Sequence, residues 1–307
     1  MLSDDWSIPE DLSGNEAVAI AVETLVDWSP SEVTLEMCLA AGAVGVDIPN
    51  EVYHSLPGIS GSNLTLLAES NKHLDNKRLF NLGDSPALAF GTLLHTMVLE
   101  PDTVNDRYVV MPTFGTKAET GKSIAQSERE FYEKNTDRII IESELMIKAE
   151  RMSRNVRSIS GDIIDKGIKE RSLFADLDGV ICKCRLDIDL EDDGDDYDLK
   201  SITLGIKEFS DATLEAHIKK LRYHWSAAFR NIIRRHLGKP VRNSYLIFCN
   251  TGMGHMVRVI RISPLWIREA EAIVEELLES RRFYLASRID DRPVAVIDDK
   301  WRKIQEY

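Results

Sequence analysis

The stretch VICKCRLDIDL at residues 180–190 decides the fold class. Its even positions are apolar or thiol throughout, and its odd positions from 183 to 189 are charged. Alternation with a period of two residues predicts a β-strand with one face in the core and one polar face. Asp178-Gly179 directly before it is a typical hairpin turn, so residues 171–176 are expected to form the preceding strand.

Strands and helices follow this hairpin on both sides. Further strands are expected over residues 197–202, 243–250 and 255–262. Helices are expected over 17–26, 30–41 with Ser31 as its N-cap, 60–73, 85–100, 119–135, 143–169, 212–237 and 264–282. These elements predict an α/β fold with a mixed central sheet flanked by helices.

Charge divides the 307-residue chain unevenly. Its net charge is −13, and residues 1–50 hold ten acids and no Lys or Arg. We therefore expect an acidic N-terminal appendage over 1–50, a main domain over 51–285 and a C-terminal tail over 286–307. The four cysteines are too few for a disulfide framework, which indicates a reducing compartment, the cytoplasm. No apolar run approaches the roughly 18 residues that span a bilayer.

The charge reverses sign between residues 219 and 261. This stretch holds ten Lys or Arg residues and no acid. Its local field suits a polyanion such as nucleic acid, despite the acidic average. A solvated helix face is the alternative explanation.

Asp187, Asp198 and Lys200 form the chemically most informative group. Alternation places Asp198 and Lys200 on one strand face, about 6.6 Å apart, and a hairpin brings Asp187 beside them. Two converging carboxylates suit Mg²⁺, with Mn²⁺ as the alternative. Lys200 would then position or deprotonate a water, or stabilise developing negative charge. The alternative is a hairpin whose acids only face solvent.

Two more residues are candidates for the same site. Gly91 lies one turn before His95, where it would allow close backbone approach and let the imidazole reach a metal ion. Glu170 directly precedes the first core strand and offers another carboxylate. The alternatives are a satisfied core histidine and an ordinary helix-end charge.

An ordered set of short motifs between residues 52 and 282 resembles the PDDEXK-type exonucleases of the RecE (exodeoxyribonuclease VIII) group, which is common in phages and prophages. The motifs are VYH at 52–54, GIS at 58–60, FGTLLH at 90–95, LEP at 99–101, RYV at 107–109, TKAETGK at 116–122, Glu170, KCRLD at 183–187, DLKS at 198–201, YH at 223–224 and AAF at 227–229.

This resemblance implies a Mg²⁺-dependent exodeoxyribonuclease. It implies that His95, Asp187 and Asp198 bind the metal, that Lys200 is the catalytic lysine and that Glu170 supports the site. Such enzymes degrade double-stranded DNA from 5′ ends, leave 3′ single strands for a RecT-type annealing protein and assemble into rings. We expect DNA contacts at Arg185, Arg222, His224, Ser226 and Arg230.

The chain departs from the family in the basic helix. Ser226 and Arg230 stand where the group usually has Gln and Tyr. The alternative function is therefore a catalytically weakened, DNA-binding recombination accessory protein with the same fold. An iron–sulfur nuclease would need four convergent cysteines, whereas Cys182 and Cys184 are expected to point into the core.

Overall fold

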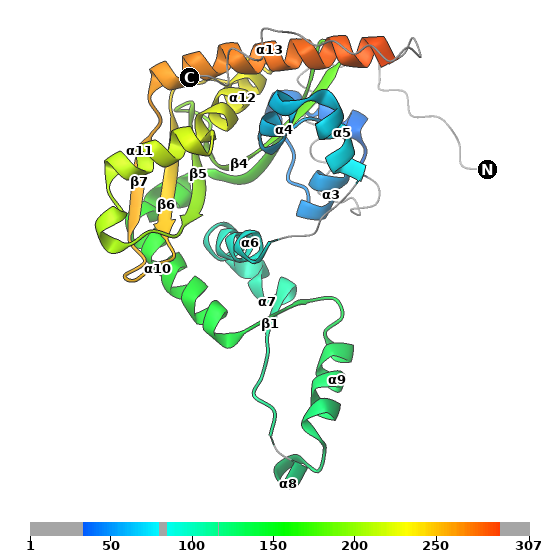
Figure 1. Cartoon of the computed structure of the whole chain (residues 1–307), viewed down its shortest axis with the longest axis vertical. Helices are drawn as coiled ribbons and strands as arrows, with labels where there is room; N and C mark the ends of the chain where they lie inside the picture. The colour runs from blue at the N-terminus through cyan, green and yellow to red at the C-terminus, as the bar shows by residue number, and fades with distance from the viewer. Residues whose placement is uncertain (1–32, 80–84, 116, 289–307) are drawn as a thin grey trace, which may run out of the picture.

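A five-stranded mixed sheet forms the centre of the protein (Figure 1). The computed structural model describes residues 33–79, 85–115 and 117–288. The strands lie in the order β3 (Ile168–Leu177), β4 (Val180–Leu190), β5 (Asp195–Ile202), β6 (Ser244–Asn250) and β7 (Val257–Arg261). Within this sheet of the described residues, β5 and β6 are the only parallel neighbours. The predicted mixed sheet and its flanking helices are confirmed.

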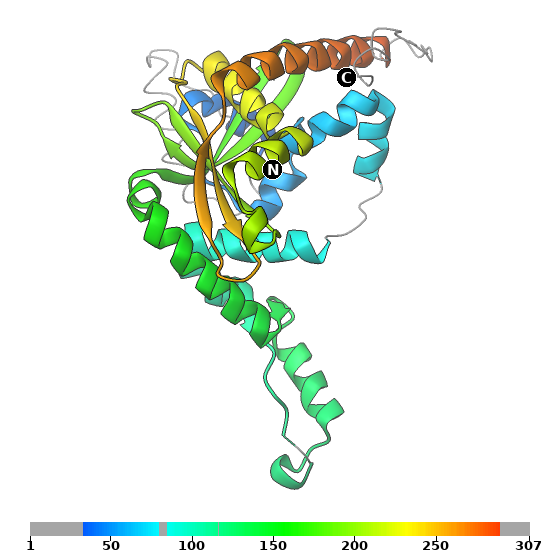
Figure 2. The ribbon, with the colours of Figure 1, turned by 60° about the vertical axis from the view of Figure 1, so that its left-hand side comes forward.

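Helices cover both faces of the sheet and bury two separate apolar cores (Figures 1 and 2). One face packs on α6 (Pro86–Leu99) and α10 (Ser143–Lys166). The other packs on α4 (Leu64–Glu69), α11 (Asp211–Lys220), α12 (Tyr223–His236) and α13 (Pro264–Arg288). Cys182 and Cys184 lie in the second core, as expected.

The side chains of β4 pack into different cores before and after Asp187. Leu186 packs in the core of α12 and α13, whereas Ile188 packs in the core of α6 and α10. The polar face of β4 is present as expected but is itself largely buried, because Lys183 and Asp187 are 5% and 8% exposed. The buried Lys183 Nζ donates hydrogen bonds to the Tyr53 and Leu56 carbonyls, at 2.5 and 2.6 Å, and these offset the cost of its burial.

The segment that provides those carbonyls packs along β3. It contains α2 (Leu35–Ala40), η1 (Gly42–Val44), α3 (Asn50–Ser55) and η2 (Gly61–Asn63). The backbones of Val46 and Ser172 pair in both directions, at 2.9 Å each. Part of the stretch assigned to the appendage thus packs into the fold. Its helix begins at Leu35 with Thr34 as N-cap, while Ser31 and the helix over 17–26 lie outside the described residues.

Two predicted helices of the body are each divided. The expected helix 212–237 breaks at Arg222, whose φ of +56° ends α11 and starts α12. The expected helix 60–73 becomes η2, α4 and α5 (Asn71–Leu79), because Ser70 is extended and its hydroxyl accepts the His73 N–H at 2.9 Å. Hydrophobic periodicity does not reveal such breaks, since the helices on either side bury the same face.

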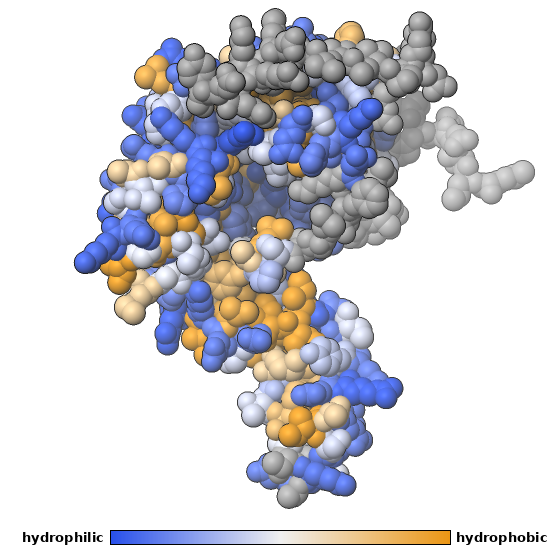
Figure 3. Space-filling view, in the orientation of Figure 1, coloured by the Kyte–Doolittle hydropathy of each residue, from blue (hydrophilic) through white to orange (hydrophobic). Residues whose placement is uncertain are grey.

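An arm projects from the body below α6 (Figure 2). After η3 (Pro101–Thr103) and α7 (Val104–Arg107), β1 (Tyr108–Val110) pairs in parallel with β2 (Ile139–Ile141). The arm holds α8 (Lys117–Thr120) and α9 (Ile124–Lys134), where one helix over 119–135 was expected. Figure 3 shows hydrophobic residues over its base. In the part of the chain that is described, no helix has the length and apolarity to span a membrane.

Candidate metal centre

Four elements bring the predicted site residues together. His95 comes from α6, Glu170 from β3, Asp187 from β4, and Asp198 with Lys200 from β5. One ligand atom from each of His95, Glu170 and Asp187 lies within 4.8 Å of the other two. The face shown in Figure 3 is hollowed above α6, and hydrophilic residues line the hollow.

Glu170 stands opposite Asp187 in the β3–β4 ladder. The pairs on either side, Lys169 with Ile188 and Arg171 with Leu186, set this register. Like charges directly opposite on neighbouring strands repel each other. Burial first, and the Asp187 charge second, raise the pKa of Glu170 to about 8. Glu170 also has a φ of +51°, a left-handed conformation that costs a non-glycine residue about 1–3 kcal/mol.

His95 is held with one ring nitrogen turned to the carboxylates. Its Nε2 lies 2.8 Å from the Leu199 carbonyl, which only accepts, so Nε2 carries the proton. Its Nδ1 lies 3.6 Å from Asp187 Oδ2, the same oxygen that accepts the Leu199 N–H at 2.7 Å. A ring fixed through its second nitrogen in this way is typical of a metal-ligating histidine.

This donor set fits a divalent ion. It combines an oriented imidazole nitrogen with two carboxylates that oppose each other across a β-ladder. Burial raises the pKa of Asp187 as well, and His95 only partly offsets the effect. A cation between the carboxylates would remove this repulsion and favour their ionised forms. The carboxylate oxygens suit Mg²⁺ and Mn²⁺, whereas an imidazole nitrogen is more usual as a ligand of transition-metal ions.

Asp198 and Lys200 form a close pair beside this group. Lys200 Nζ lies 2.6 Å from Asp198 Oδ2. Burial alone would raise the pKa of Asp198, but Lys200 and Arg230 outweigh it and lower that pKa. Burial alone would lower the pKa of Lys200, but Asp198 and Asp187 raise it instead. Lys200 is therefore an ammonium at neutral pH, which favours charge stabilisation over service as a base.

Two of the expected DNA contacts point into the protein. Arg185 donates to the Ile48 carbonyl at 2.8 Å and to Ser172 Oγ at 3.0 Å, and its guanidinium covers the Tyr53 ring. Arg230 is 5% exposed and pairs with acids of β5. Both guanidinium groups therefore bind other groups of the protein.

The other three expected DNA contacts lie around the start of α12. Arg222 places its guanidinium 4.4 Å from the centre of the Trp225 ring. His224 Nδ1 lies 3.2 Å from the Ile218 carbonyl, and burial lowers the pKa of His224. Ser226 faces η2, where a side chain added at Gly61 would come within 3.0 Å of its hydroxyl. Their role in DNA binding stays a prediction.

The basic stretch is not one solvated face. Arg230, Arg234 and Lys239 are buried and form ion pairs with acids of the β4–β5 hairpin. Sequence reasoning missed these acids, which are Asp189, Glu191 and Asp196. The available signal was the spacing of Arg230 and Arg234, one turn apart on the apolar side of α12.

Gly91 does not have the role expected for it. A side chain added there would meet only Ser201 Oγ, at 3.7 Å, which is ordinary van der Waals distance. The approach of α6 to β5 therefore does not depend on a glycine. Instead, Leu94 and Val98 pack against Leu199 in the core of α6 and α10.

Comparisons with known proteins agree with this architecture. Residues 59–283 match the family described as "PDDEXK-like domain of unknown function (DUF3799)". No curated protein matches the chain. The crystal structure of a "Putative exonuclease" from Eubacterium rectale has a TM-score of 0.52 and 14% sequence identity, covering 84% of this chain and 94% of that one. At this identity the likeness shows a shared fold.

Proposed function

Because this chain belongs to the PDDEXK-like family DUF3799, we propose that it is a nuclease that hydrolyses DNA phosphodiester bonds with a divalent ion. One observation carries the proposal. His95, Glu170 and Asp187 converge within 4.8 Å. On β5 beside them, Lys200 forms an ion pair with Asp198. A metal-ligand set next to an ammonium can stabilise the negative charge that develops when water attacks a phosphodiester.

Each residue has a defined task in this proposal. His95 and Asp187 hold the ion, with Glu170 and Asp198 as further ligands. The ion, when bound, polarises the phosphate and neutralises its charge. Lys200 directs its ammonium Nζ at the negative charge that develops on the phosphate oxygens. Glu170, whose pKa is about 8, gives up its proton when it becomes a ligand.

Finer features of the proposal rest on the motif resemblance. We propose Mg²⁺ as the ion, with Mn²⁺ as a substitute, and ends of linear double-stranded DNA as the substrate. Digestion from 5′ ends would leave 3′ single strands for a RecT-type annealing protein. A ring of identical subunits and a cytoplasmic location belong to the same proposal. Membership of the RecE group stays a prediction.

A catalytically weakened DNA-binding accessory protein is the second candidate. Ser226 and Arg230 favour it, because they replace residues usual in the resembling group. The convergence of His95, Glu170 and Asp187 favours an active enzyme instead, since an unused site would not need two opposed acids.

Digestion of end-labelled linear duplex with Mg²⁺ or Mn²⁺ separates these functions. We expect loss of the 5′ label first and no cutting of closed circular DNA. Asp187→Asn and Asp198→Ala should abolish digestion, while Glu128→Gln on the exposed side of α9 should not change it. Binding of duplex without digestion by the wild-type protein would favour the accessory function. Digestion by Asp187→Asn at the wild-type rate would contradict the proposed site.

A further inference from the structure

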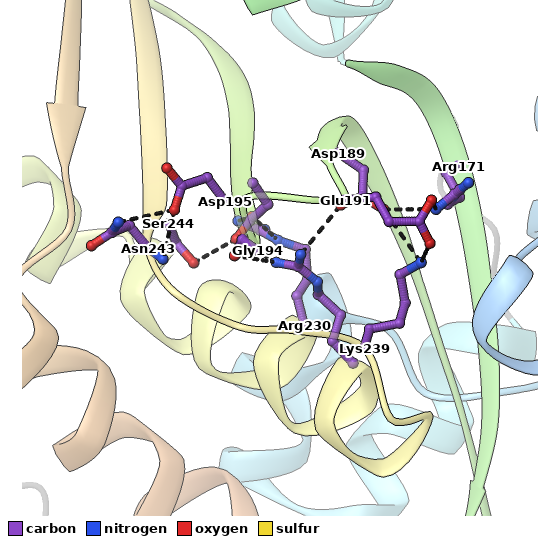
Figure 4. Close-up of polar contacts among 11 residues, drawn as sticks. Arg171, Asp189, Glu191, Gly194, Asp195, Arg230, Lys239, Asn243 and Ser244 are labelled. Carbon is purple, nitrogen blue, oxygen red and sulfur yellow. Dashed lines mark hydrogen bonds and ion pairs between the residues drawn. The ribbon is translucent and has the colours of Figure 1, made fainter. Parts of the chain in front are cut away.

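Arg230 joins two acids that lie two residues apart on β5. Its Nε and NH2 lie 2.8 and 2.7 Å from Asp196 Oδ2, and its NH1 lies 3.4 Å from Asp198 Oδ1. Asp196 and Asp198 share a face of the strand with Lys200. Arg230 reaches both acids from α12. Figure 4 shows its side chain extending from that helix toward the β4–β5 hairpin.

The side chain of Asp196 is itself held by several contacts. It is 1% exposed, and Ser244 Oγ donates to its Oδ1 at 2.6 Å. Arg234, one turn further along α12, lies 3.5 Å from the same oxygen and 3.2 Å from Asp189 Oδ1. The anchor of Arg230 is therefore tied to β4, β6 and α12 at once.

Asp198 in turn is held on both sides. Its Oδ2 pairs with Lys200 at 2.6 Å and its Oδ1 with Arg230 at 3.4 Å. The carboxylate thus has its orientation set by one residue of the reacting centre and one residue behind it. Only a planar fork of donors spans both aspartates, because the compact ammonium of a lysine acts as a single point charge.

We propose that Arg230 is a positioning residue that fixes the Asp198 carboxylate beside Lys200 and the metal ion, with Asp196 as its anchor. This inference rests on the proposed function and adds to it. Arg230 takes no part in DNA contact, since its guanidinium is enclosed between α12 and β5. Residues that orient a metal ligand from behind strongly affect metal affinity and activity.

Arg230→Met, Arg230→Lys and the matched control Arg234→Met test the proposal. Arg234 is also buried on α12 and also pairs with Asp196, but it has no contact with Asp198. Mn²⁺ binding to the full-length protein is measured by titration calorimetry, and digestion of linear duplex at saturating Mn²⁺ is measured beside it. Circular dichroism establishes that each variant is folded.

We expect Arg230→Met to weaken Mn²⁺ binding about 10- to 100-fold and to lower the digestion rate at saturating Mn²⁺. Arg230→Lys keeps the buried charge and so preserves the fold even if the Met variant does not. Its Mn²⁺ affinity should fall about 10-fold, because a lysine cannot span both aspartates. Arg234→Met should change Mn²⁺ affinity by no more than about threefold, since Ser244 and Arg230 still hold Asp196 and Arg230 keeps its contact with Asp198.

Two results would overturn the inference. The first is that Arg230→Lys binds Mn²⁺ and digests DNA like the wild type. This result counts against the inference whether Arg230→Met also behaves like the wild type or fails to fold. The other is an equal loss in the Arg234 control, which would indicate a general structural role. The proposed function fails differently, through a wild-type protein that neither binds Mn²⁺ nor digests DNA.

Discussion

Glu170 should make the metal-free protein less stable as the pH rises. In the folded protein it keeps its proton up to a pKa of about 8, whereas its ordinary pKa is 4.5. Between these values the folded state holds one proton more than the unfolded chain, so stability falls with increasing pH. The loss from this one group between pH 6 and pH 9 is about 2–3 kcal/mol.

Glu170→Gln removes this ionisation while keeping the shape of the side chain. Urea unfolding in the presence of a chelator, followed by tryptophan fluorescence, gives the free energy of unfolding at both pH values. Between pH 6 and pH 9 the free energy of unfolding of the wild type should fall by about 2–3 kcal/mol more than that of the variant. Glu128→Gln, at an exposed position of α9, is the control and should follow the wild type.

Parallel pH profiles for the wild type and Glu170→Gln would refute this reasoning. They would mean that Glu170 is already ionised at pH 6, and hence that it is neither buried nor opposed by Asp187 as the ladder requires. A change in the control would point instead to a general effect of charge. Adding Mn²⁺ should abolish the difference in slope, because a bound ion favours the carboxylate form.

Three further predictions concern the reacting centre, the fold and the DNA. Lys200→Met should lower digestion more than about 100-fold in a cleavage assay while calorimetry still detects Mn²⁺ binding. Gly45→Ala should lower the free energy of unfolding by about 1–3 kcal/mol, since φ is +75° and the new methyl group would lie 2.8 Å from Leu173 Cδ2. Lys220→Gln, at the exposed end of α11, should reduce the salt dependence of DNA affinity by about one unit of log–log slope.

The pairing of Glu170 with Asp187 could be predicted from the sequence. A two-residue turn at Asp178-Gly179 pairs Leu177 with Val180, and counting back along both strands places Glu170 opposite Asp187. Strand β4 itself could be predicted because its alternation is strict from Cys182 to Leu190. Sequence reasoning selected both acids but did not use the turn to pair them.

Other features depend on tertiary contacts that no local pattern reports. Leu221-Arg222 has neither Gly nor Pro, so the break between α11 and α12 leaves no local signal. The buried position of Arg230 depends on Asp196, which lies 34 residues away and meets it only when β5 packs on α12. A charged helix residue without such a partner would face solvent.

Anomalous diffraction from a crystal soaked in Mn²⁺ would locate the bound ion. We expect a peak between His95 Nδ1 and the carboxylates of Glu170 and Asp187, and its loss in Asp187→Asn. A crystal that binds Mn²⁺ elsewhere, with these three side chains bonded only to protein, would contradict this expectation.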